Sequence, residues 1–212
     1  RPDDLLARAF SAVIERTGID PAEVDDVFAG CANQAGEDNR NVARMSLLLA
    51  GLPQSVPGAT INRLCGSGLQ AIVSAAQGLL LGDTDVAVAA GAESMSRGPY
   101  LLPQARWGAR MGDLQGIDYT VGVLQDPFQH FHMGITAENV SAKHGITREM
   151  QDELALTSQR RAARAIAEGR FASQIVALEL KTRKGSVQFS VDEHVRADVT
   201  AEQLAGMKPV FK

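Results

Sequence analysis

The segment Asn62-Arg63-Leu64-Cys65-Gly66-Ser67-Gly68-Leu69 joins an extended run over residues 55–61 to a helical run over about 69–81. The next apolar run, 85–92, consists of small residues and is typical of a strand buried on both faces. This order of strand, helix and strand predicts right-handed crossovers and a parallel sheet. We therefore expect an α/β fold in which Cys65 lies where a strand ends and a helix begins.

The residues before this segment extend the same pattern. Apolar residues at helical spacing predict an amphipathic helix over 3–17, which Gly18 ends. Asp20-Pro21-Ala22-Glu23 predicts the start of a short helix that leads into a strand near 27–31. A second helix is expected over 41–51. Residues 1–97 are therefore predicted to form a sheet-based core.

The pattern changes after Arg97. Residues 98–133 are rich in Gly, Pro, Gln and aromatic residues without a clear period, and such long irregular stretches are usually functional. Regular elements then return: helices at 134–144 and 148–168, a hairpin over 175–191, and a capping box at Thr200-Ala201-Glu202-Gln203 that opens a short helix. Residues 98–212 therefore predict an inserted lobe of mixed α/β structure.

The composition is that of a soluble globular enzyme. The 212 residues are 45% hydrophobic and 22% charged, and the net charge of −4 argues against general nucleic-acid binding. The unbroken apolar runs are too short to span a bilayer, and no signal peptide is visible. Two cysteines without zinc spacing predict no disulfide framework and no metal site, and they suit a reducing, cytoplasmic compartment.

Positive charge is concentrated in the second half of the chain. Residues 101–212 hold fourteen of the 21 Lys and Arg residues. Most of these predict a solvated helix and hairpin, whereas a few cations could meet a phosphate-bearing ligand.

Cys65 is the first candidate for chemistry because it immediately precedes a helix. The free N–H groups and the positive dipole end of a helix N-terminus favour a thiolate. Gly66 and Gly68 remove side-chain bulk, so the backbone can turn sharply and a substrate can come close. A backbone N–H at or beside Cys65 can donate to an oxyanion. These are the parts of an acyl-thioester site.

A structural role for the cysteines has to be weighed against this chemistry. A lone cysteine is commonly a small buried hydrophobe, so the local sequence leaves both interpretations of Cys65 open. Cys31, in Ala29-Gly30-Cys31-Ala32, has no comparable setting and predicts packing alone.

A nucleophilic cysteine needs a base, most often histidine. His144 ends an expected helix and His194 lies in a charged loop, so both predict ordinary roles. Of the two histidines in the irregular segment, His130 and His132, the second is the better candidate for a pocket. The spacing does not show which histidine, if any, contacts Cys65.

Several blocks, in order along the chain, resemble those of one family, the thiolases (acyl-CoA C-acetyltransferases). The segment from Asn62 to Leu69 resembles the acyl-enzyme signature of that family. The other blocks are Gly91-Ala92-Glu93-Ser94-Met95-Ser96, His132-Met133-Gly134-Ile135-Thr136-Ala137-Glu138-Asn139-Val140, Asp192-Glu193-His194-Val195-Arg196 and Lys208-Pro209-Val210-Phe211. Their order and spacing fit over essentially the whole chain, which makes the resemblance more specific than any single motif.

The resemblance implies a thiolase-like layered fold, with an N-terminal core domain over 1–97 and a loop domain that binds substrate and coenzyme A over 98–212. It implies that Cys65 attacks an acyl-CoA thioester and carries the acyl group. Five residues match positions that line the path of coenzyme A and its pantetheine arm: Leu124, His132, Met133, Arg196 and Phe211.

The resemblance also separates the roles of two of these residues. Arg196 would face the nucleotide end of coenzyme A, which suits a phosphate-bearing ligand. His132 would line the substrate channel and would not be the base that activates Cys65. This implication replaces the expectation, drawn from the sequence around it, that His132 is the candidate base.

The sequence departs from the family in what it lacks. The catalytic His in a Gly-His-Pro block, the second catalytic Cys in a Gly-rich block and an Asn-Glu-Ala-Phe block belong to the C-terminal half of the family, and none occurs in these 212 residues. The first strand of the family also has no counterpart before Arg1. We therefore expect the C-terminal thiolase domain to be absent and this chain alone to be unable to complete a thiolase cycle.

The substrate and the partners follow from the family resemblance only in outline. The segment 30–41 resembles 3-oxoadipyl-CoA thiolases of aromatic degradation, whereas His132-Met133-Gly134 resembles the acetoacetyl-CoA and short-chain type. Coenzyme A and acyl-CoA are expected as substrates, with no permanently bound cofactor, no metal, no nucleic acid and no membrane. The alternative is a catalytically incomplete module that binds coenzyme A or acyl groups on the same fold. Decarboxylating condensing enzymes share the fold and a cysteine, but their sequence around that cysteine differs from the segment 62–69, so they rank below.

A homo-oligomer, dimer or tetramer, is also expected from the family. The irregular segment 98–117, with Tyr100 and Trp107, predicts either a contact between subunits or ordinary packing of the lobe.

Overall fold

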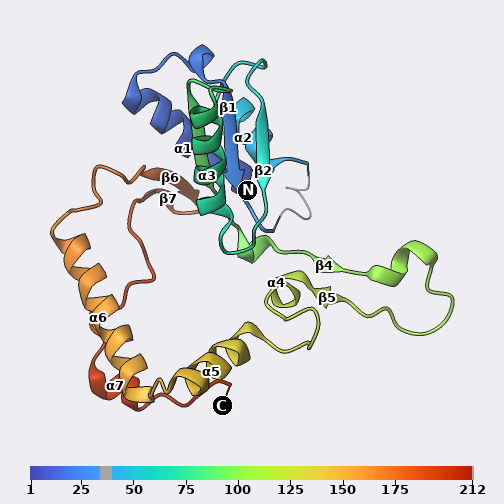
Figure 1. Ribbon diagram of the computed structural model, residues 1–212, viewed down its shortest axis with the longest axis vertical. Coiled ribbons are helices and arrows are strands. Elements are labelled where there is room, and N and C mark those ends of the chain that lie inside the picture. Colours follow the sequence, from blue (N-terminus) through green and yellow to red (C-terminus); the bar gives the residue numbers. More distant parts are fainter. Residues whose placement is uncertain (34–39, 212) are drawn as a thin grey trace. The chain divides into compact units, whose positions relative to one another are not determined.

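The computed structural model describes residues 1–33 and 40–211. These fold as two compact units, Arg1–Val123 and Leu124–Lys212, each with its own helices and strands (Figure 1).

A three-stranded parallel sheet forms the centre of the first unit. Its strands are β1 (Asp26–Gly30), β2 (Gly58–Ile61) and β3 (Ala87–Gly91), in the order β2-β1-β3. Both pairs run parallel, so all three strands end at the same edge of the sheet. The parallel sheet predicted from the strand–helix–strand order is confirmed.

Helices cover this sheet on both sides (Figure 1). Helix α2 (Val42–Leu49) packs on β1 and β2 and also against α1 (Pro2–Thr17), whereas α3 (Ser67–Leu81) packs on β1 and β3. Side chains alternate along a strand, and accordingly Val27 and Ala29 are fully buried while Phe28 between them is half-buried. The main core lies on the α1 and α2 side, where Leu6, Phe10, Val27, Ala29, Val42 and Leu47 form one cluster.

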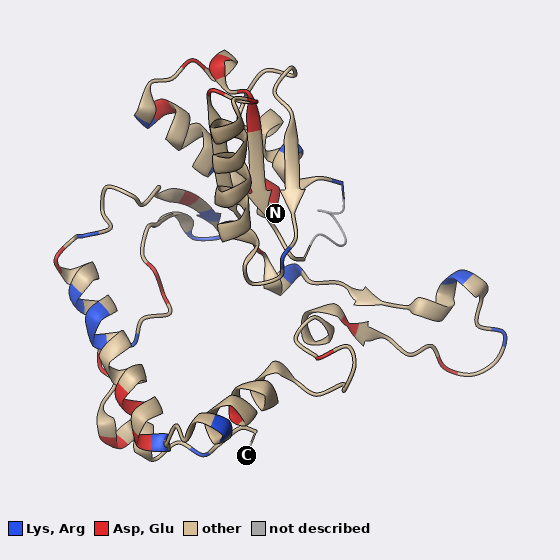
Figure 2. Cartoon of the chain, in the orientation of Figure 1, with Lys and Arg blue, Asp and Glu red and all other residues tan. Residues whose placement is uncertain are grey.

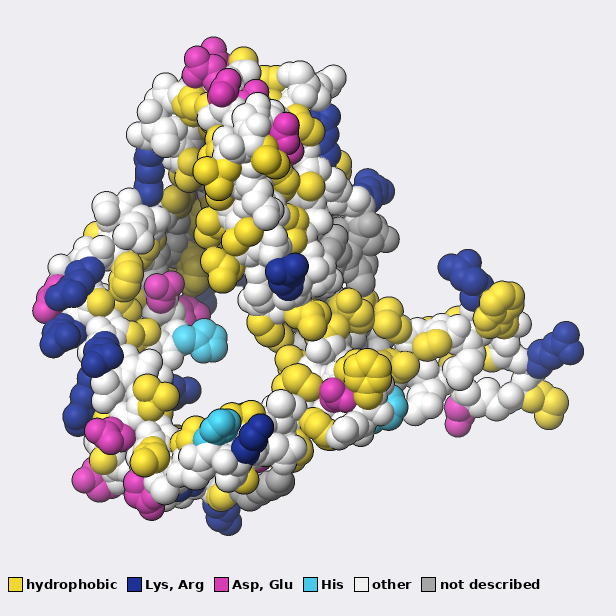
Figure 3. Space-filling view, in the orientation of Figure 1, with side chains coloured by type: hydrophobic (Ala, Val, Ile, Leu, Met, Phe, Trp, Pro, Cys, Tyr) yellow, Lys and Arg dark blue, Asp and Glu magenta, His cyan; other side chains and the backbone are white. Residues whose placement is uncertain are grey.

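Helix α3 is apolar on the face that points away from the sheet. Its buried residues, Ser67, Ala71 and Ala75, form a stripe of small side chains against the strands. Leu69 and Leu80 are 69% and 86% exposed, and Figure 3 shows apolar side chains gathered over this helix. An apolar helix of this kind is normally covered on all sides.

The segment Leu64–Leu81 also differs from the sequence-based expectation about membrane length. Its 18 residues have a mean hydropathy of 1.4, which makes it long and apolar enough, by length and composition alone, to cross a membrane. The expectation rested on unbroken apolar runs, whereas Gly, Ser and Gln interrupt this helix without making it polar overall. A core helix of a globular protein meets the same criterion.

Strand β3 is less buried than its composition suggests. Residues 87–90 are half-buried, although the run 85–92 predicted burial on both faces. The reason is its place at an edge of the sheet, since the central strand is β1.

The first unit extends beyond Arg97 because the arm that follows is bonded back to it. This arm, 98–123, holds β4 (Tyr100–Leu101), the 3-10 helix η4 (Pro103–Trp107), β5 (Ile117–Asp118) and α4 (Tyr119–Gly122). The Thr120 hydroxyl of the arm donates to the Met95 carbonyl at 3.3 Å, and within the arm the backbone N–H of Tyr119 donates to the Pro99 carbonyl at 3.0 Å. The compact units therefore divide after Val123, later than the boundary predicted at 97/98, and the assignment of 98–212 to one family domain stays a prediction.

The second unit contains the elements predicted for it. They are α5 (Met133–His144), α6 (Arg148–Ala167), the antiparallel hairpin of β6 (Leu178–Thr182) and β7 (Gly185–Phe189), and α7 (Ala201–Ala205). Thr200 and Gln203 form the predicted capping box. Figure 2 shows the acidic residues of α6 in its first half, beside Arg148 at its start, and its other basic residues in the second half; acid in the first turn and Arg164 in the last are favoured by the helix dipole.

Candidate active site

Cys65 lies on a tight turn between β2 and α3 and is exposed. The residue before it, Leu64, has a left-handed φ of 49°, which costs energy for a side chain with a Cβ. Two polar side chains hold this turn. The Asn62 Oδ1 accepts from the Leu64 N–H at 3.0 Å, and the Ser67 hydroxyl accepts from the Arg63 N–H at 2.9 Å and donates to the Leu64 carbonyl at 2.6 Å.

The N-terminus of α3 follows immediately and carries no side-chain cap. Its N-cap residue is Gly66, and no acidic residue lies in its first turn. Among the α-helices in the described part of the chain, α3 alone has neither a side-chain cap nor a first-turn acid. The positive end of the helix dipole therefore lies beside Cys65 without a capping side chain, and its effect on the thiol stays a prediction.

Glycines bring this helix end close to the carboxyl edge of the sheet. A Cβ on Gly30, the last residue of β1, would collide with the backbone of Ser67 and Gly68. A Cβ on Gly91, the last residue of β3, would lie 3.4 Å from the Gly68 Cα. The place of Cys65 is thus set by backbone packed on backbone.

Sequence reasoning missed the carboxylate that organises the neighbouring turn. Glu93, two residues after β3, accepts from the backbone N–H groups of Ala32 and Asn33, each at 2.8 Å. The signal was present, since an acidic residue directly after a buried parallel strand lies at the edge where such folds place their sites. In the sequence, Glu93 stands out only as part of the block Gly91-Ala92-Glu93-Ser94-Met95-Ser96.

Four of the five residues predicted to line the coenzyme A path come together in the second unit. His132 is the N-cap of α5, and its Nδ1 accepts from the Gly134 N–H at 3.0 Å. The ring of His132 stacks on Phe211 with centroids 5.0 Å apart. The Met133 N–H donates to the Leu124 carbonyl at 2.8 Å, which closes the base of the loop between them.

Gly134 explains how Phe211 reaches this place. A Cβ on Gly134 would collide with the Phe211 ring, so the ring occupies the space that any other residue would fill. The small residue after His132-Met133 is therefore needed for the contact with the C-terminal block.

Arg196, the fifth predicted residue, is held elsewhere in the same unit. Its backbone N–H donates to the Gln159 Oε1 of α6 at 2.7 Å. No described contact joins Arg196 to the His132 and Phe211 pair.

A cavity of about 640 Å³ in the second unit is bordered by Phe211 and by charged residues of both signs, namely Glu138, Arg148, Asp152 and Lys208. The Arg148 Nε is paired with the Asp152 Oδ1 at 2.8 Å, and an Arg148 Nη2 hydrogen donates to the Leu204 carbonyl. Of the two cations on this wall, Lys208 is thus the one better placed to meet a phosphate.

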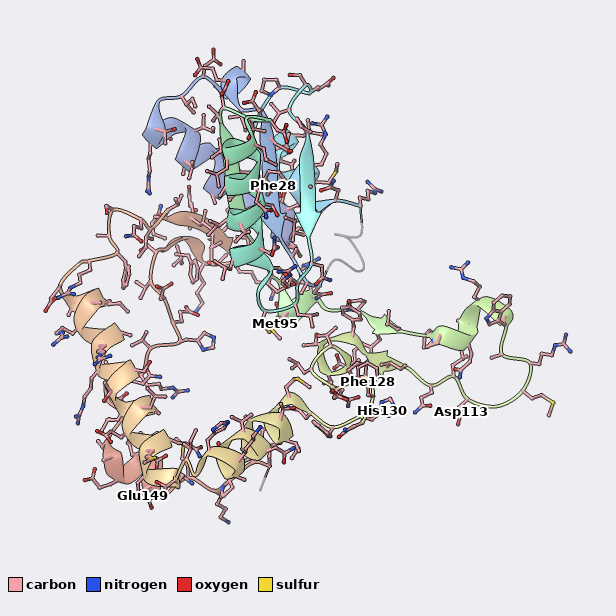
Figure 4. The ribbon with its side chains drawn as sticks, viewed as in Figure 1. Phe28, Met95, Asp113, Phe128, His130 and Glu149 are labelled. Atoms are coloured by element: carbon pink, nitrogen blue, oxygen red, sulfur yellow. The ribbon has the colours of Figure 1, made fainter. Side chains whose placement is uncertain are left out.

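The other histidines occupy ordinary positions. His144 is the last residue of α5, where left-handed Gly145 ends the helix, and His194 is exposed, both as predicted. His130 has a left-handed φ of 59° in a turn where the Asp126 Oδ1 accepts from two backbone N–H groups. Figure 4 shows His130 and Phe128 at neighbouring points of this turn.

The two cysteines differ as the sequence suggested. Cys31 is buried in the core of the first unit, whereas Cys65 is exposed at the helix N-terminus. Cys65 belongs to the first unit, and the five predicted ligand-lining residues belong to the second.

The whole chain, residues 1–212, matches the family model described as "Thiolase, N-terminal domain". It is 50% identical over 210 residues to beta-ketothiolase BktB of Cupriavidus necator and 48% identical over 218 residues to beta-ketoadipyl-CoA thiolase of Pseudomonas aeruginosa. Each alignment covers 99% of this chain but only 53% and 54% of the two relatives. The chain thus spans about half the length of the curated relatives it matches.

Two solved structures have the same fold. The acetyl-CoA acetyltransferase of Bacillus anthracis matches with a TM-score of 0.94 at 47% identity, and the human mitochondrial 3-ketoacyl-CoA thiolase matches with 0.94 at 39% identity. Both alignments cover 100% of this chain and 53% and 54% of those chains. The resemblance and the α/β fold class predicted from the sequence are confirmed.

Proposed function

The chain belongs to the thiolase family, and we propose that the protein transfers acyl groups between coenzyme A thioesters through an acyl-enzyme at Cys65. The Cys65 thiolate attacks a carbonyl carbon of the substrate. In thiolysis the bond between this carbon and the α-carbon of the acetyl-CoA portion breaks, and the acetyl-CoA carbanion that leaves takes up a proton. In condensation the bond between this carbon and the sulfur of coenzyme A breaks, and coenzyme A leaves as a thiolate. The acyl group then passes from Cys65 to coenzyme A or to the acetyl-CoA carbanion.

The observation that carries this proposal is the open end of α3 beside an exposed cysteine. A nucleophile needs access, a stabilised thiolate and donors for the oxyanion. Cys65 is exposed, and α3 has no side-chain cap and no first-turn acid among the described residues. The identities of 50% and 48% to two relatives named as thiolases, over this half of their length, support the same chemistry.

The test is acylation of the full-length protein. Incubation with acetyl-CoA should add one acetyl group to the peptide that contains Cys65, as detected by mass spectrometry. The Cys65→Ala variant should lose this adduct and the coenzyme A-dependent cleavage of acetoacetyl-CoA by at least about 10³-fold. The matched control is Cys31→Ala, which removes the other, buried thiol. If the Cys65→Ala variant cleaves acetoacetyl-CoA at the wild-type rate, the proposal is refuted.

We also propose that Leu124, His132, Met133, Phe211 and Arg196 line the path of coenzyme A. The first four form one apolar and aromatic surface, which suits the pantetheine arm, while a guanidinium at Arg196 suits a phosphate. Arg196→Ala should raise the KM for coenzyme A about tenfold and leave kcat nearly unchanged. With 3′-dephospho-coenzyme A, wild type and variant should have similar KM values; an equal loss with both ligands would contradict a phosphate contact.

A substrate among the short or dicarboxylic 3-oxoacyl-CoA thioesters is proposed from the names of the relatives, which include a beta-ketoadipyl-CoA thiolase and acetyl-CoA acetyltransferases. Part of the segment 30–41 that carried the 3-oxoadipyl resemblance lies outside the described residues. Comparison of kcat/KM for acetoacetyl-CoA and 3-oxoadipyl-CoA decides between these substrates.

The second candidate function is a catalytically silent module that binds coenzyme A. It is favoured by one observation, that the five residues proposed to line the coenzyme A path belong to the second compact unit, whereas Cys65 belongs to the first. Calorimetry with coenzyme A, run beside the acylation assay, separates the two. Binding without acylation of Cys65 would support the module and refute the enzyme.

A homo-oligomer in a reducing, cytoplasmic compartment is proposed for the full-length protein. The arm 98–123 carries large apolar side chains in solvent, with Trp107 85% and Met111 97% exposed, which is typical of a contact surface. Sedimentation should give a dimer or tetramer, and Trp107→Asp should weaken it. A monomer over the whole concentration range would contradict this proposal.

The exposed apolar face of α3 is proposed to be covered by further protein that the relatives, nearly twice as long, possess. Deuterium exchange in the full-length protein should then show α3 among its slowest regions. Fast exchange over Leu69–Leu81 would refute the cover.

A further inference from the structure

The strained turn that presents Cys65 is tied to a second turn by one amide side chain. The Asn62 Oδ1 holds the N–H of left-handed Leu64 at 3.0 Å, as described above. On its other side, the Asn62 Nδ2 donates to the Ala32 carbonyl at 3.3 Å. The conformation of the Cys65 turn therefore depends on where the Ala32 carbonyl lies.

The position of Ala32 depends in turn on a carboxylate. The Glu93 Oε2 accepts from the Ala32 N–H and the Oε1 from the Asn33 N–H, both at 2.8 Å. The Cys31 Sγ lies 3.7 Å from the same Oε1. A carboxylate that accepts two short bonds from consecutive N–H groups makes charge-assisted, directional contacts. In Figure 4 the label Met95 marks the segment that follows Glu93, near the start of α3.

We propose that Glu93 is a positioning residue for the nucleophile, acting through the turn at Ala32 and the amide of Asn62 on the backbone of Leu64 and Cys65. The role of Cys65 itself rests on the proposed function. What is new is that the acid after β3 governs how the thiol after β2 is presented, although no contact joins Glu93 to Cys65 in the described residues. The connection crosses all three strands at their carboxyl ends.

The same sheet supplies a matched control at its opposite end. The Asp25 Oδ2, just before β1, accepts from the N–H groups of Asp85 at 2.7 Å and Val86 at 3.0 Å. The N–H of Val86, and to a smaller extent that of Asp85, holds the pKa of Asp25 below its ordinary value. Asp25 and Glu93 thus each accept from two consecutive N–H groups, Asp25 with one oxygen and Glu93 with both, but only Glu93 stands at the edge of the sheet that carries Cys65.

The experiment compares Glu93→Gln with Asp25→Asn in the full-length protein. Each variant keeps one oxygen and replaces the other with an NH₂ group; in Glu93→Gln this group meets an N–H where the wild type has an acceptor. The primary readout is the second-order rate of alkylation of Cys65 by iodoacetamide, resolved by peptide mass spectrometry. The second readouts are kcat, KM and Tm.

The expected result is a separation of reactivity from stability. Glu93→Gln should slow alkylation of Cys65 and lower kcat at least tenfold, with KM changed less than threefold. Asp25→Asn removes the charge but can keep the one oxygen that accepts both bonds, so it should lower Tm only slightly and leave alkylation and kcat within twofold of wild type. Alkylation of Glu93→Gln within twofold of wild type would overturn the proposal, since Glu93 would then be a structural residue only.

A double-mutant cycle tests the route. If Glu93 acts through Asn62, Glu93→Gln should have no further effect on alkylation in an Asn62→Ala background. Full additivity of the two substitutions would refute the route. If Glu93→Gln is not recovered folded, Glu93→Asp, which keeps the charge but is one methylene shorter, takes its place; a wild-type alkylation rate for Glu93→Asp would likewise overturn the proposal.

The alkylation measurement needs no substrate, so it is independent of the proposed reaction. A wild-type protein that forms no acyl-enzyme would refute the thiolase function and leave the comparison of Glu93 with Asp25 intact. A protein that acylates Cys65 but is insensitive to Glu93→Gln would refute only the positioning role.

Discussion

Helices α3 and α5 both begin beside a predicted site residue, and they use their first N–H groups in opposite ways. At α5 the His132 Nδ1 accepts from the Gly134 N–H, so the terminus is closed by a side chain that also stacks on Phe211. At α3 the N-cap is Gly66, without a side chain, and the exposed Cys65 lies just outside. On the proposed function, the closed terminus would fix a surface that binds coenzyme A, whereas the open one would leave positive potential for the reacting thiol.

The termini of α6 and α7 show what an ordinary closed end contains. Thr147 and Thr200 cap them, and Glu149 and Glu202 lie in their first turns. Each described α-helix other than α3 has a side-chain cap or a first-turn acid. The open end of α3 is therefore a departure from the pattern that the rest of this chain follows.

The largest effect should come from forcing the open terminus away from the sheet. In Gly30→Ala the new Cβ meets the backbone of Ser67 and Gly68, which cannot rotate aside. We expect the free energy of unfolding to fall by about 3 kcal/mol and the alkylation rate of Cys65 to fall with it. Denaturant unfolding and iodoacetamide kinetics measure the two.

The control for this substitution lies on the other side of the same contact. A Cβ on Gly68 meets no atom within 4 Å, so Gly68→Ala should change the free energy of unfolding by less than about 0.5 kcal/mol. If Gly30→Ala is as stable as Gly68→Ala, the close backbone approach described for α3 is wrong.

A smaller effect should follow from closing the α3 terminus with charge. A Cβ on Gly66 would lie 3.4 Å from the Arg63 carbonyl oxygen, an ordinary contact, so a side chain fits there. Gly66→Asp places a carboxylate where the helix end favours the Cys65 thiolate, and it should slow alkylation of Cys65 about tenfold, or ~1.4 kcal/mol. Gly66→Asn provides the same shape without charge, and a rate as slow as that of Gly66→Asp would show that shape, not charge, is responsible.

The closed terminus of α5 can be opened in the complementary experiment. His132→Ala removes both the cap and the ring stacked on Phe211, and should cost about 1 kcal/mol of stability. His132→Asn restores a cap without an aromatic ring, so it should regain most of the stability but not the KM for acyl-CoA. Equal stability of the Ala and Asn variants, by thermal unfolding, would contradict the capping role.

The smallest effect is a pH dependence confined to the ordinary termini. The Thr147 hydroxyl and the helix N–H of Glu149 lower the pKa of Glu149, and the helix N–H of Glu202 and the Thr200 hydroxyl lower the pKa of Glu202. Because the folded values lie below the unfolded one, their stabilisation is present above about pH 4.3 and is lost as pH falls through the folded values.

The test compares the Tm of wild type with that of the Glu149→Gln, Glu202→Gln double variant as a function of pH. The Tm of the double variant should lie slightly below that of wild type at pH 7, and the two should converge at acidic pH. A Tm difference that is constant from pH 7 to pH 3 would show that the two carboxylates do not contribute through their charge.

Local signals in the sequence predicted most elements of the fold. The capping box at Thr200 and Gln203, the end of α1 at Gly18 and the hairpin at Gly185 were all predicted, because caps and turns depend on residues within a few positions. The position of Cys65 before α3 followed from the same kind of signal.

Contacts between distant residues could not be predicted in this way. Nothing near Gly134 indicates that the Phe211 ring will fill its place, and nothing near Ala32 indicates that Glu93 will hold it. The half-burial of β3 depends on strand order, which a single run of small residues does not contain. Such features arise from packing across the fold rather than from periodicity.

The meeting of Gly30, Gly68 and Gly91 has a consequence for anyone who wishes to redesign this protein. Since backbone lies on backbone there, these three positions offer no side chain to enlarge, shrink or recharge, and a Cβ at Gly30 has no room. If the proposed coenzyme A path is used, Leu124, Met133 and Phe211 of the second unit are the positions at which directed evolution should change substrate preference. Of these positions, Gly30 excludes a Cβ, whereas a Cβ on Gly68 meets no atom within 4 Å.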